Sequence, residues 1–556
     1  MSRQRKWTAI GLLLIAAFAF RFYVAVCLPN DVPGDSKVYT RMARNLLEQH
    51  VYSHAEKPPY PPSLIRLPGY SIFLAAVYSV FGHGNNTAVR IIQSVLDTFT
   101  CGLVAMIAYY WQPQENRKRA SSIAALALAA LCPFTTIYVA TILTEVWASL
   151  FAVALCLLAT IALKTKDLQR ALWWWAAAGL VGGLSVFFRP DSGLFVAAVG
   201  LTLVISVFWG PEGVRESRPL RRRVLVLLLQ GSVLSLAFAL VLVPWTVRNW
   251  RTFHVFQPLA PTHGQMPGEF VPNGYYAWVR SWLDDRKYIE PMLWSLDESE
   301  IDLDELPPGA FDSEEEKARV QRLIDRYNDP QDEEVSDQSS QTEAPAVIPR
   351  PTVTPTTAET PDKANAASAP QQTPSPETDT GDESDQADHQ DSAKAETPAP
   401  ELPPEMTPAL DAAFGEIARE RNLRRPLRHY FWLPLKRARS LWIGPHADYF
   451  PFAGELFPLE DLDHATHQQI WLPLFAALVW IYTLLGLAGA WVLWRSPDAA
   501  ARRWLLLVFL MIFIRLAYFS TMENPEPRYT VEIFPFLAIL GGIAIARLVK
   551  VRQRAS

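Results

Sequence analysis

The chain has 556 residues, of which 50% are hydrophobic and 19% are charged, and its formal net charge at pH 7 is −5. Acidic residues are concentrated in one tract near 329–401, which is almost free of aromatic residues and rich in Pro, Thr, Ser and Gln. Because such a composition cannot bury a core, we expect 329–403 to be a disordered insertion, and the rest of the chain is net positive.

The chain begins with a basic stretch that is followed by an apolar run at about 7–28. A secretory signal peptide has a shorter apolar region and ends in a cleavage site with small residues, which this run lacks. We therefore expect an uncleaved first transmembrane helix.

Apolar runs of about 20 residues, long enough to cross a bilayer, recur along the chain. The ten expected spans are 7–28, 88–111, 120–139, 145–163, 171–188, 192–209, 224–245, 470–494, 504–520 and 530–549. A run at 68–82 is too short to span, so we expect a re-entrant or interfacial helix there. The predicted fold class is an all-α polytopic membrane protein.

Four cysteines lie in or beside these apolar runs, at Cys27, Cys101, Cys132 and Cys156. The sequence contains no Cys-x-x-Cys or His-Glu-x-x-His pattern. This placement argues against a disulfide framework and against a zinc site, and it is typical of small packing residues.

Lysine and arginine cluster at alternate ends of the expected spans. The basic clusters lie at 3–6, 117–119, 164–170, 215–223, 495–503 and 550–554. Counted from a cytoplasmic N-terminus, all six fall on the cytoplasmic side, in agreement with the positive-inside rule. This topology places both termini in the cytoplasm, and it places the loop at 29–87 and the segment at 246–469 on the outer side.

The expected organisation has two transmembrane modules, 1–245 and 470–556, with the outer segment between them. This segment divides into an outer loop at 246–328, the acidic tract at 329–403 and a basic part at 404–469. In the last part, Leu, Tyr and Phe residues mix with Arg and Lys, a pattern that can lie in the headgroup layer of a membrane. It either positions a lipid substrate or serves as a plain surface anchor, and nucleic acid is a poor partner on that side.

Charged side chains recur at the outer ends of the spans. They are Asp35, Glu145, Arg189, Asp191, Arg248, Arg515 and Arg528. A charge near the membrane is usually tolerated only beside a partner or a watery cavity, so these residues are predicted to converge on one site. Arg515 is the hardest of these residues to explain without a functional site, because it lies inside the apolar run "MIFIRLAYF".

Several of these residues also have simpler interpretations. Asp35 suits the N-terminus of a helix, and Glu145 suits the start of the fourth span, where negative charge is favourable. Arg189 precedes a proline and can cap a helix end, and Arg248 can contact lipid headgroups.

The residue types together suit transfer from an anionic lipid carrier. Arginines can hold a phosphate through paired hydrogen bonds, and one carboxylate can take the proton of an attacking hydroxyl or amine. A lipid phosphate is a weak base that leaves without protonation, so one base is enough. We predict that Asp35 is this base.

Six segments carry a family resemblance. They are the loop with Asp35 and Tyr39, "RLPGYSIFLAAVYSVFG", "ILTEVWASLF", "FRPDSGLF", "PWTVRNWRTF" and "PEPRYTVEIFPFLAILGG". The order of these segments along the chain, their spacing and their common position on the outer side of the membrane resemble those of the GT-C integral-membrane glycosyltransferases. The group that they resemble in particular is that of the protein O-mannosyltransferases and aminoarabinose transferase-like proteins. The resemblance covers roughly 1–300 and 405–550.

The resemblance implies a helical bundle that takes a hexose or pentose from a polyprenyl-phosphate donor on the outer face of a bacterial inner membrane and transfers it with inversion. The family's acidic residue in the first outer loop matches Asp35, and Asp31 is a second candidate because the chain has a single Gly-Asp-Ser and no obvious Asp-x-Asp. The residues assigned to donor phosphate or sugar contacts are Arg66, Arg189, Arg248 and Arg528. No metal or further cofactor is expected to be required.

Two alternatives remain open at this stage. A transporter or flippase of lipid-linked sugars would show internal repeats and charges along a pathway, whereas the charges here gather at one face. A polysaccharide polymerase or ligase would use a diphosphate-linked donor. The acceptor is a glycan, a lipid or a protein.

Overall fold

A computed structural model describes residues 3–30, 34–208, 219–329, 404–454, 456 and 466–548, with no account of the side chains of residues 3–7. The predictions for Asp31 and for most of the acidic tract, 330–403, lie outside the described residues. The cluster at 550–554 and the part of the cluster before Pro219 also lie outside what is described, and for the cluster at 3–6 only the backbone is described.

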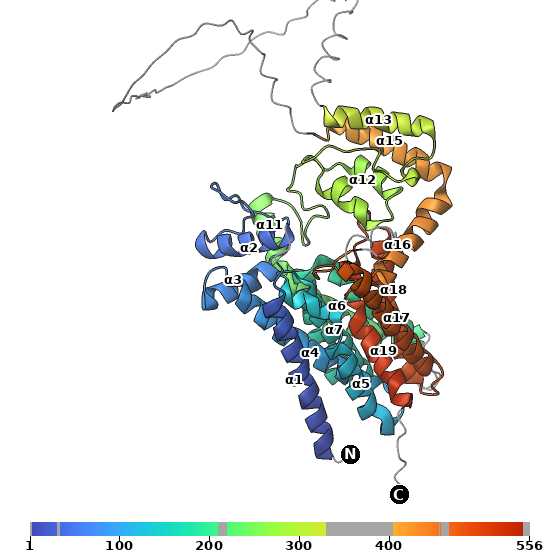
Figure 1. The fold of residues 1–556 in the computed structure, drawn as a ribbon. Helices are drawn as coiled ribbons and strands as arrows, with labels where there is room; N and C mark the ends of the chain where they lie inside the picture. Colours follow the sequence, from blue (N-terminus) through green and yellow to red (C-terminus); the bar gives the residue numbers. More distant parts are fainter. Residues whose placement is uncertain are drawn as a thin grey trace, which may run out of the picture.

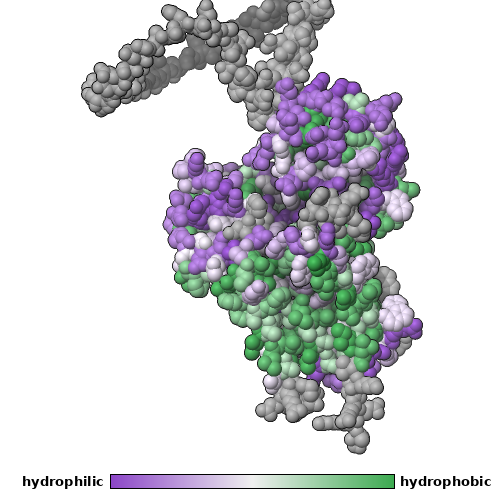
Figure 2. Space-filling view, viewed as in Figure 1, coloured by the Kyte–Doolittle hydropathy of each residue, from purple (hydrophilic) through white to green (hydrophobic). Residues whose placement is uncertain are grey.

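The described residues form helices and loops, with no strand among them. The long helices run side by side in a bundle, and a smaller helical domain stands on one end, opposite the first turn of α1 and the last turn of α19 (Figure 1). Hydrophobic residues cover the visible face of the bundle, whereas the domain is mostly hydrophilic (Figure 2). We call the end of the bundle that carries this domain the domain end.

Eight helices of the described part are long and apolar enough to cross a membrane. They are α1 (Arg3–Cys27), α4 (Asn86–Trp111), α7 (Glu145–Lys164), α8 (Leu168–Phe188), α9 (Gly193–Phe208) together with the 3₁₀ turn Pro190–Ser192 before it, α11 (Leu220–Phe253), α17 (Thr466–Trp494) and α18 (Ala499–Ser520). These helices coincide with eight of the expected spans. The fold is therefore that of an all-α, multi-pass integral membrane protein, as predicted.

The expected span at 120–139 is broken in the structure. It consists of α5 (Lys118–Ala130) and α6 (Pro133–Thr136), and α6 continues as a 3₁₀ turn at Ile137–Ala140. The two parts are bent by 52°. Pro133 has no backbone N–H with which to continue α5, so the helix ends before it.

A buried arginine satisfies the carbonyl groups that this break leaves open. The guanidinium of Arg21, on α1, donates to the carbonyl oxygens of Ala129 and Ala130 at 3.0 Å each. Its Nε lies 2.6 Å from Oδ2 of Asp97, on α4, and both side chains are almost completely buried. Arg21 thus joins α1, α4 and the end of α5 inside the bundle.

The last expected span, 530–549, is shorter than predicted. It is replaced by a 3₁₀ turn at Pro527–Thr530 and by α19 (Ile533–Leu548), which has 16 residues. Nevertheless, α19 lies against α17, α5 and α4, and nearly all of its side chains are buried. A helix enclosed by its neighbours is shielded from lipid along its length, so its position does not depend on matching the bilayer thickness.

Glycines allow α19 to approach its neighbours closely. A Cβ atom added at Gly489, on α17, would overlap the backbone of Leu540, and one added at Gly542 would overlap Ala125 of α5. Helices in membranes commonly associate through such small residues, because they permit close contact between backbones.

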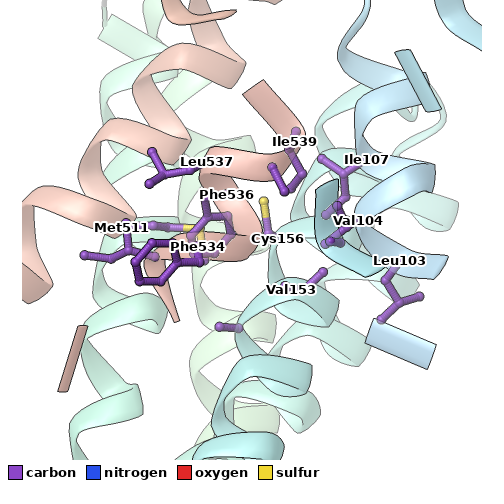
Figure 3. Close-up of a cluster of buried hydrophobic side chains, with 14 of the residues drawn as sticks. Leu103, Val104, Ile107, Val153, Cys156, Met511, Phe534, Phe536, Leu537 and Ile539 are labelled. Carbon is purple, nitrogen blue, oxygen red and sulfur yellow. The ribbon is translucent and has the colours of Figure 1, made fainter. Parts of the chain in front are cut away.

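Apolar side chains from helices far apart in the sequence meet around α19. Figure 3 shows Leu103, Val104 and Ile107 of α4, Val153 and Cys156 of α7, Met511 of α18, and Phe534, Phe536, Leu537 and Ile539. Cys101, Cys132 and Cys156 are buried and free, as expected of packing residues, and Cys27 is free and exposed.

Two short helices, which follow α1 and precede α4 in the chain, lie near the domain end, to one side of the bundle (Figure 1). These are α2 (Asp35–Glu48) and α3 (Gly69–Phe81), which pack against each other. Helix α3 has 13 residues, fewer than a span needs, in agreement with the short helix expected at 68–82. Within the connecting loop, the amide of Asn45 donates to the carbonyl oxygen of Ser53 at 2.9 Å, which ties the loop to α2.

The helical domain is built from both sides of the acidic tract. Its helices are α12 (Asn273–Arg280), α13 (Glu314–Asn328) and α15 (Pro408–Arg424), and they share one apolar core. The backbone N–H of Met406 donates to Asp297 at 2.7 Å, so the chain resumes its fold directly after the tract. The segments on either side of 330–403 therefore fold as one unit.

Helix α16 (Leu433–Ile443) joins this domain to the bundle, where it packs against α18. Its buried Arg437 donates to the carbonyl oxygens of Leu283 and Arg280 at 2.8 and 2.6 Å. A π-helical turn at Arg428–Trp432 precedes α16 and exposes most of its large side chains.

Candidate functional site

Asp35 is the first residue of α2, a helix that lies near the domain end. The preceding Gly34 has a φ of 83°, a conformation that glycine adopts without steric cost. The hydroxyl of Ser36 donates to the carbonyl oxygen of Ile142 at 3.2 Å and fixes this turn against the loop before α7. The N-terminus of α2 thus presents a carboxylate at a defined position, where the helix dipole favours its charge.

Two arginines from distant parts of the chain contact this carboxylate. Nη2 of Arg66, in the loop between α2 and α3, lies 3.1 Å from Oδ1 of Asp35. Nη1 of Arg528, in the 3₁₀ turn before α19, lies 3.2 Å from Oδ2. The Asp35 side chain remains 29% exposed, so each oxygen has a guanidinium partner while the group still faces open space.

These contacts set the protonation state of Asp35. Burial raises the pKa of Asp35, but the charges and hydrogen bonds of Arg528 and Arg66 lower it more, and the net pKa lies below its ordinary value. The carboxylate is therefore ionised at neutral pH. It is a weak base as long as both guanidinium groups remain on it.

Arg528 is itself held by further groups. Its Nε lies 2.7 Å from Oε2 of the buried Glu526, and its Nη1 lies 3.4 Å from the hydroxyl of Tyr449. The sequence predictions did not include Glu526 and Tyr449. Glu526 had a signal in the sequence, because it stands two residues before Arg528, whereas Tyr449 comes from a loop that no motif marked.

A second group of charged side chains is more deeply buried than Asp35, and we call it the buried charge cluster. Arg189 contacts Glu145 at 2.7 Å and Asp191 at 3.0 Å. Arg515 contacts Asp191 at 2.8 Å and Glu532 at 3.0 Å. Four of these five residues were predicted to converge. Glu532 was missed, although a carboxylate at the start of an apolar run was a signal for it.

The cluster leaves no positive charge free for a ligand. It has three carboxylates and two guanidinium groups, so it carries one negative charge in excess when all are ionised. The side chain of Arg515 is completely buried. Arg189 and Arg515 are therefore neutralised by the protein itself.

Tyr529 connects the two groups of charges. Its ring centroid lies 5.6 Å from Cζ of Arg189 and 5.2 Å from Cζ of Arg528. Its hydroxyl donates to Glu526 at 2.7 Å. The Asp35 site and the buried charge cluster are therefore neighbours across one aromatic ring.

Tyr39 lies one turn after Asp35 on α2, and its ring meets the edge of Tyr70 at 5.1 Å. Burial raises the pKa of Tyr39 to about 12, so the phenol stays neutral. A neutral phenol can donate or accept a hydrogen bond beside Asp35, but it does not supply a base at neutral pH.

Arg248, near the end of α11, differs from the other predicted arginines. Its Nη1 donates to the carbonyl oxygen of Ser63 at 2.8 Å and to the amide oxygen of Asn249 at 2.9 Å. Its guanidinium also lies over the rings of Trp245 and Phe253. Among the described residues, no carboxylate lies within 4 Å of it, and it adjoins the loop that carries Arg66.

A cavity of about 450 Å³ adjoins the buried charge cluster at the domain end. Three segments line it: the start of α9 with the residues before it, the end of α18 with the loop after it, and the loop after α11. The polar lining residues are Arg189, Asp191, Thr262, His263, Tyr518, Glu523, Asn524 and Tyr529. Of these, only Arg189 and Asp191 were predicted as site residues. Thr262, His263, Glu523 and Asn524 lie in loops that the sequence does not fold, and Tyr518 and Tyr529 lie in α18 and in the 3₁₀ turn Pro527–Thr530.

Within the described ranges, His, Cys, Asp and Glu side chains do not form a group of three or more that could hold a metal ion. Asp31, the second acidic candidate of the first loop, lies outside those ranges. The charges that surround Asp35 in the structure come from arginine side chains.

Comparison with solved structures gives relatives of low identity. The archaeal oligosaccharyltransferase AglB from Archaeoglobus fulgidus, in complex with an inhibitory peptide and a dolichol-phosphate, is 12% identical, with a TM-score of 0.45 over 98% of this chain and 51% of that chain. ArnT from Cupriavidus metallidurans bound to undecaprenyl phosphate is 13% identical, with a TM-score of 0.34 over 96% and 77%. This chain thus spans about half the length of the oligosaccharyltransferase.

Comparison with protein families gives a more specific result. The chain has no match among curated proteins. Residues 60–245, from the loop before α3 into α11, match the model of a family described as dolichyl-phosphate-mannose-protein mannosyltransferase. The resemblance predicted from the motifs is thereby confirmed: over residues 60–245 the chain is similar to the dolichyl-phosphate-mannose-protein mannosyltransferases.

Proposed function

We propose that the protein is a membrane glycosyltransferase that moves a hexose or pentose from a polyprenyl-phosphate donor to an acceptor. The observation that carries this proposal is the partly exposed carboxylate of Asp35 between two arginines at one end of a membrane bundle. The matched family's name supplies the class of donor, a sugar linked to a lipid phosphate. A lipid-linked donor also suits an active site built at the end of transmembrane helices.

The proposed reaction is a direct displacement. An acceptor hydroxyl or amine attacks the anomeric carbon, and the bond from this carbon to the phosphate oxygen breaks. The phosphate leaves with the electron pair, and Asp35 takes the proton of the nucleophile. One displacement from the face opposite the leaving group inverts the anomeric configuration, and it needs one carboxylate rather than the pair of a glycoside hydrolase.

Three arginines are proposed to bind the donor phosphate. Arg248 has no carboxylate partner in the described structure, and Arg66 and Arg528 each contact one oxygen of the partly exposed Asp35 carboxylate, with Arg528 also held by Glu526. When a phosphate shares the guanidinium groups of Arg66 and Arg528, these groups stabilise Asp35 less. The pKa of Asp35 then rises and the carboxylate becomes a better base, so donor binding would prepare the base for the reaction.

The other predicted residues are proposed to act differently. Glu145, Asp191, Arg189 and Arg515 neutralise one another, so we assign them to positioning the site and the sugar rather than to binding phosphate. Tyr39 is proposed to orient a substrate hydroxyl beside Asp35. The arginines supply the positive charge that a leaving phosphate needs, and for this reason we propose that no divalent metal is required.

The proposed location is a bacterial inner membrane with the active site on the outer face. The basic residues at 164–170 lie at the far ends of α7 and α8, whose other ends carry Glu145 and Arg189. Those at 495–503 lie at the start of α18, whose other end leads to the turn with Arg528, and those at 117–119 lie at the start of α5. The positive-inside rule then puts the domain, Asp35 and the acceptor outside, and both termini in the cytoplasm.

The first experiment compares membranes that contain wild-type protein or Asp35→Asn at equal amounts. Consumption of several radiolabelled polyprenyl-phosphate sugars is followed by thin-layer chromatography. Wild type should consume one donor, and Asp35→Asn should be slower by about 10²–10⁴-fold, the usual contribution of a general base. Glu48→Gln, at the other end of α2, is the matched control and should retain activity.

Equal consumption by wild type and Asp35→Asn would show that Asp35 is not the base. Absence of consumption by any form would favour a flippase or a transferase with a diphosphate-linked donor.

A further inference from the structure

The cavity beside the Asp35 site has features that the proposed phosphate contacts do not use. Its volume of about 450 Å³ lies within the range of about 300–1,000 Å³ that is common for small-molecule sites. The loop that contributes His263 to the lining continues to Gly264, which lies close to Arg66. A Cβ atom added to Gly264 would be 2.9 Å from Nη1 of Arg66. On the other side, the Tyr529 hydroxyl lies 3.4 Å from Nη2 of Arg528. The cavity is thus separated from Asp35 by one layer of side chains.

The charge of the lining disfavours a phosphate in this cavity. Two carboxylates, Asp191 and Glu523, belong to it, with side chains that are 16% and 12% exposed. The guanidinium of Arg189 also lines it, but Glu145 and Asp191 already engage this group at 2.7 and 3.0 Å. An anion would meet carboxylates without a free guanidinium, whereas a neutral group with several hydroxyls would meet hydrogen-bond acceptors.

Glu523 is held in place as such an acceptor. Oε1 of Glu523 lies 3.3 Å from Nε2 of His263, and its Oε2 lies 4.0 Å from Nη1 of Arg280, on α12. The His263 ring in turn stacks on Tyr276 of α12, with centroids 4.7 Å apart. Burial raises the pKa of Glu523, but His263, a backbone hydrogen bond and Arg280 lower it below its ordinary value. Glu523 therefore only accepts hydrogen bonds at neutral pH.

The cavity also offers apolar faces. The ring of Phe519 stacks on that of Tyr529, with centroids 4.7 Å apart and planes inclined by 14°. Tyr518 and Leu259 also line the cavity. A sugar ring has C–H faces as well as hydroxyl groups, so it matches a lining of aromatic faces interleaved with a few fixed polar groups.

We propose that this cavity binds a carbohydrate group, with Glu523 and Asp191 accepting hydrogen bonds from its hydroxyls and Phe519 contacting its ring. This inference rests on the proposed function, because it places the carbohydrate beside the base that would act on it. The group is either the sugar carried by the lipid donor or a sugar of the acceptor. The chemistry is the same in both cases, and the experiment separates the two sources.

The experiment measures protection of an introduced thiol in the full-length protein in nanodiscs. Thr262→Cys is placed on the exposed rim of the cavity in a Cys27→Ser background, since Cys27 is free and exposed, and the rate of alkylation of the introduced thiol is followed. The probes are polyprenyl phosphate, polyprenyl phosphates that carry mannose, glucose, galactose or arabinose, free methyl glycosides of these sugars, and inorganic phosphate. Ser299→Cys, exposed on the helical domain, is the matched control, and no probe should change its rate.

The expected result is that at least one sugar-bearing probe slows alkylation about fivefold or more, while polyprenyl phosphate and inorganic phosphate do not. Slowing by a lipid-linked sugar identifies the donor sugar as the occupant, and slowing by a glycoside alone identifies the acceptor. Glu523→Gln should raise the half-protecting concentration about tenfold, since a hydrogen bond to a charged group is lost. Protection by phosphate equal to that by sugars, or protection by none of the probes, would overturn the proposal.

This measurement is independent of transfer. If protection is seen while wild type and Asp35→Asn consume donor equally, the carbohydrate site stands and the role of Asp35 falls. If donor is consumed without protection by any sugar, the transferase stands and the cavity is not its carbohydrate site. Thr262 is exposed, so its replacement leaves the packing intact even if Glu523→Gln disturbs the contact with Arg280.

Discussion

Asp35 and Arg528 stand 493 positions apart in the sequence, yet Nη1 of Arg528 lies 3.2 Å from Oδ2 of Asp35. Asp35 begins the first helix after α1, and Arg528 belongs to the turn that leads into the last helix. This contact joins the two transmembrane modules at the proposed active site. The site therefore exists only when both modules are folded together.

The contacts of Arg528 lead to a first prediction. Its guanidinium reaches Asp35 and Glu526 at the same time, and a lysine ammonium cannot reproduce this fork. We expect Arg528→Lys to lower kcat/KM for the donor by about 100-fold, the scale for loss of one preorganised electrostatic contact. Initial rates at several donor concentrations would measure this. Arg319→Lys, in an exposed ion pair of the helical domain, is the control, and an equal loss in both variants would contradict the prediction.

The pH dependence of activity should report the arginines on Asp35. Because they hold its pKa below the ordinary value of about 3.9, the acid limb of kcat/KM should lie below that pH in the wild type. Arg66→Gln removes one positive charge from beside Asp35, so the pKa of Asp35 rises. The acid limb of the profile should therefore move to higher pH in this variant. The stabilising contribution of the Asp35 ion pairs is present above the ordinary pKa and is lost as the pH falls through the folded-state pKa.

The measurement is the pH profile of kcat/KM for wild type and Arg66→Gln between the lowest pH at which the protein stays folded and pH 8. Arg44→Gln, an exposed position on α2, is the control and should leave the limb unchanged. A limb that stays in place, or moves to lower pH, in Arg66→Gln would show that Asp35 is not the titrating group.

Inside the bundle, the pair of Arg21 and Asp97 should matter for stability rather than for transfer. Both side chains are almost completely buried, so Asp97→Asn leaves the Arg21 charge without its partner. Breaking a buried pair in this way costs about 3–5 kcal/mol. Unfolding of purified protein followed by tryptophan fluorescence would test it. Glu56→Gln, in an exposed pair with Arg41, should change the free energy of unfolding by less than about 1 kcal/mol.

Removal of metal ions provides a further test. Arginine side chains surround Asp35 and are proposed to stabilise the leaving phosphate, so treatment with EDTA should leave donor consumption unchanged. Activity before and after chelation, and after addition of Mg²⁺ or Mn²⁺, would be compared at the same ionic strength. A loss of activity on chelation that Mg²⁺ or Mn²⁺ restores would contradict the proposal.

The sequence by itself determined the spans, because a helix that crosses a bilayer must be long and apolar whatever its neighbours are. Eight of the expected spans, the short helix at 68–82 and the family resemblance were read correctly. The sequence did not reveal the bend after Ala130 or the short length of α19. Both depend on neighbours, since Arg21 satisfies the open carbonyl groups at the bend and closely packed helices enclose α19.

The same division holds for the site. Charged residues at helix ends in an apolar chain are conspicuous, so Asp35, Arg528 and most residues of the buried charge cluster were singled out as candidates from the sequence. Only the tertiary structure decided which charges pair. In it Arg66 and Arg528 pair with Asp35, and Arg189 and Arg515 pair with the carboxylates of the buried charge cluster. Partners and cavities arise from contacts between segments hundreds of residues apart, and local sequence pattern carries no record of such contacts.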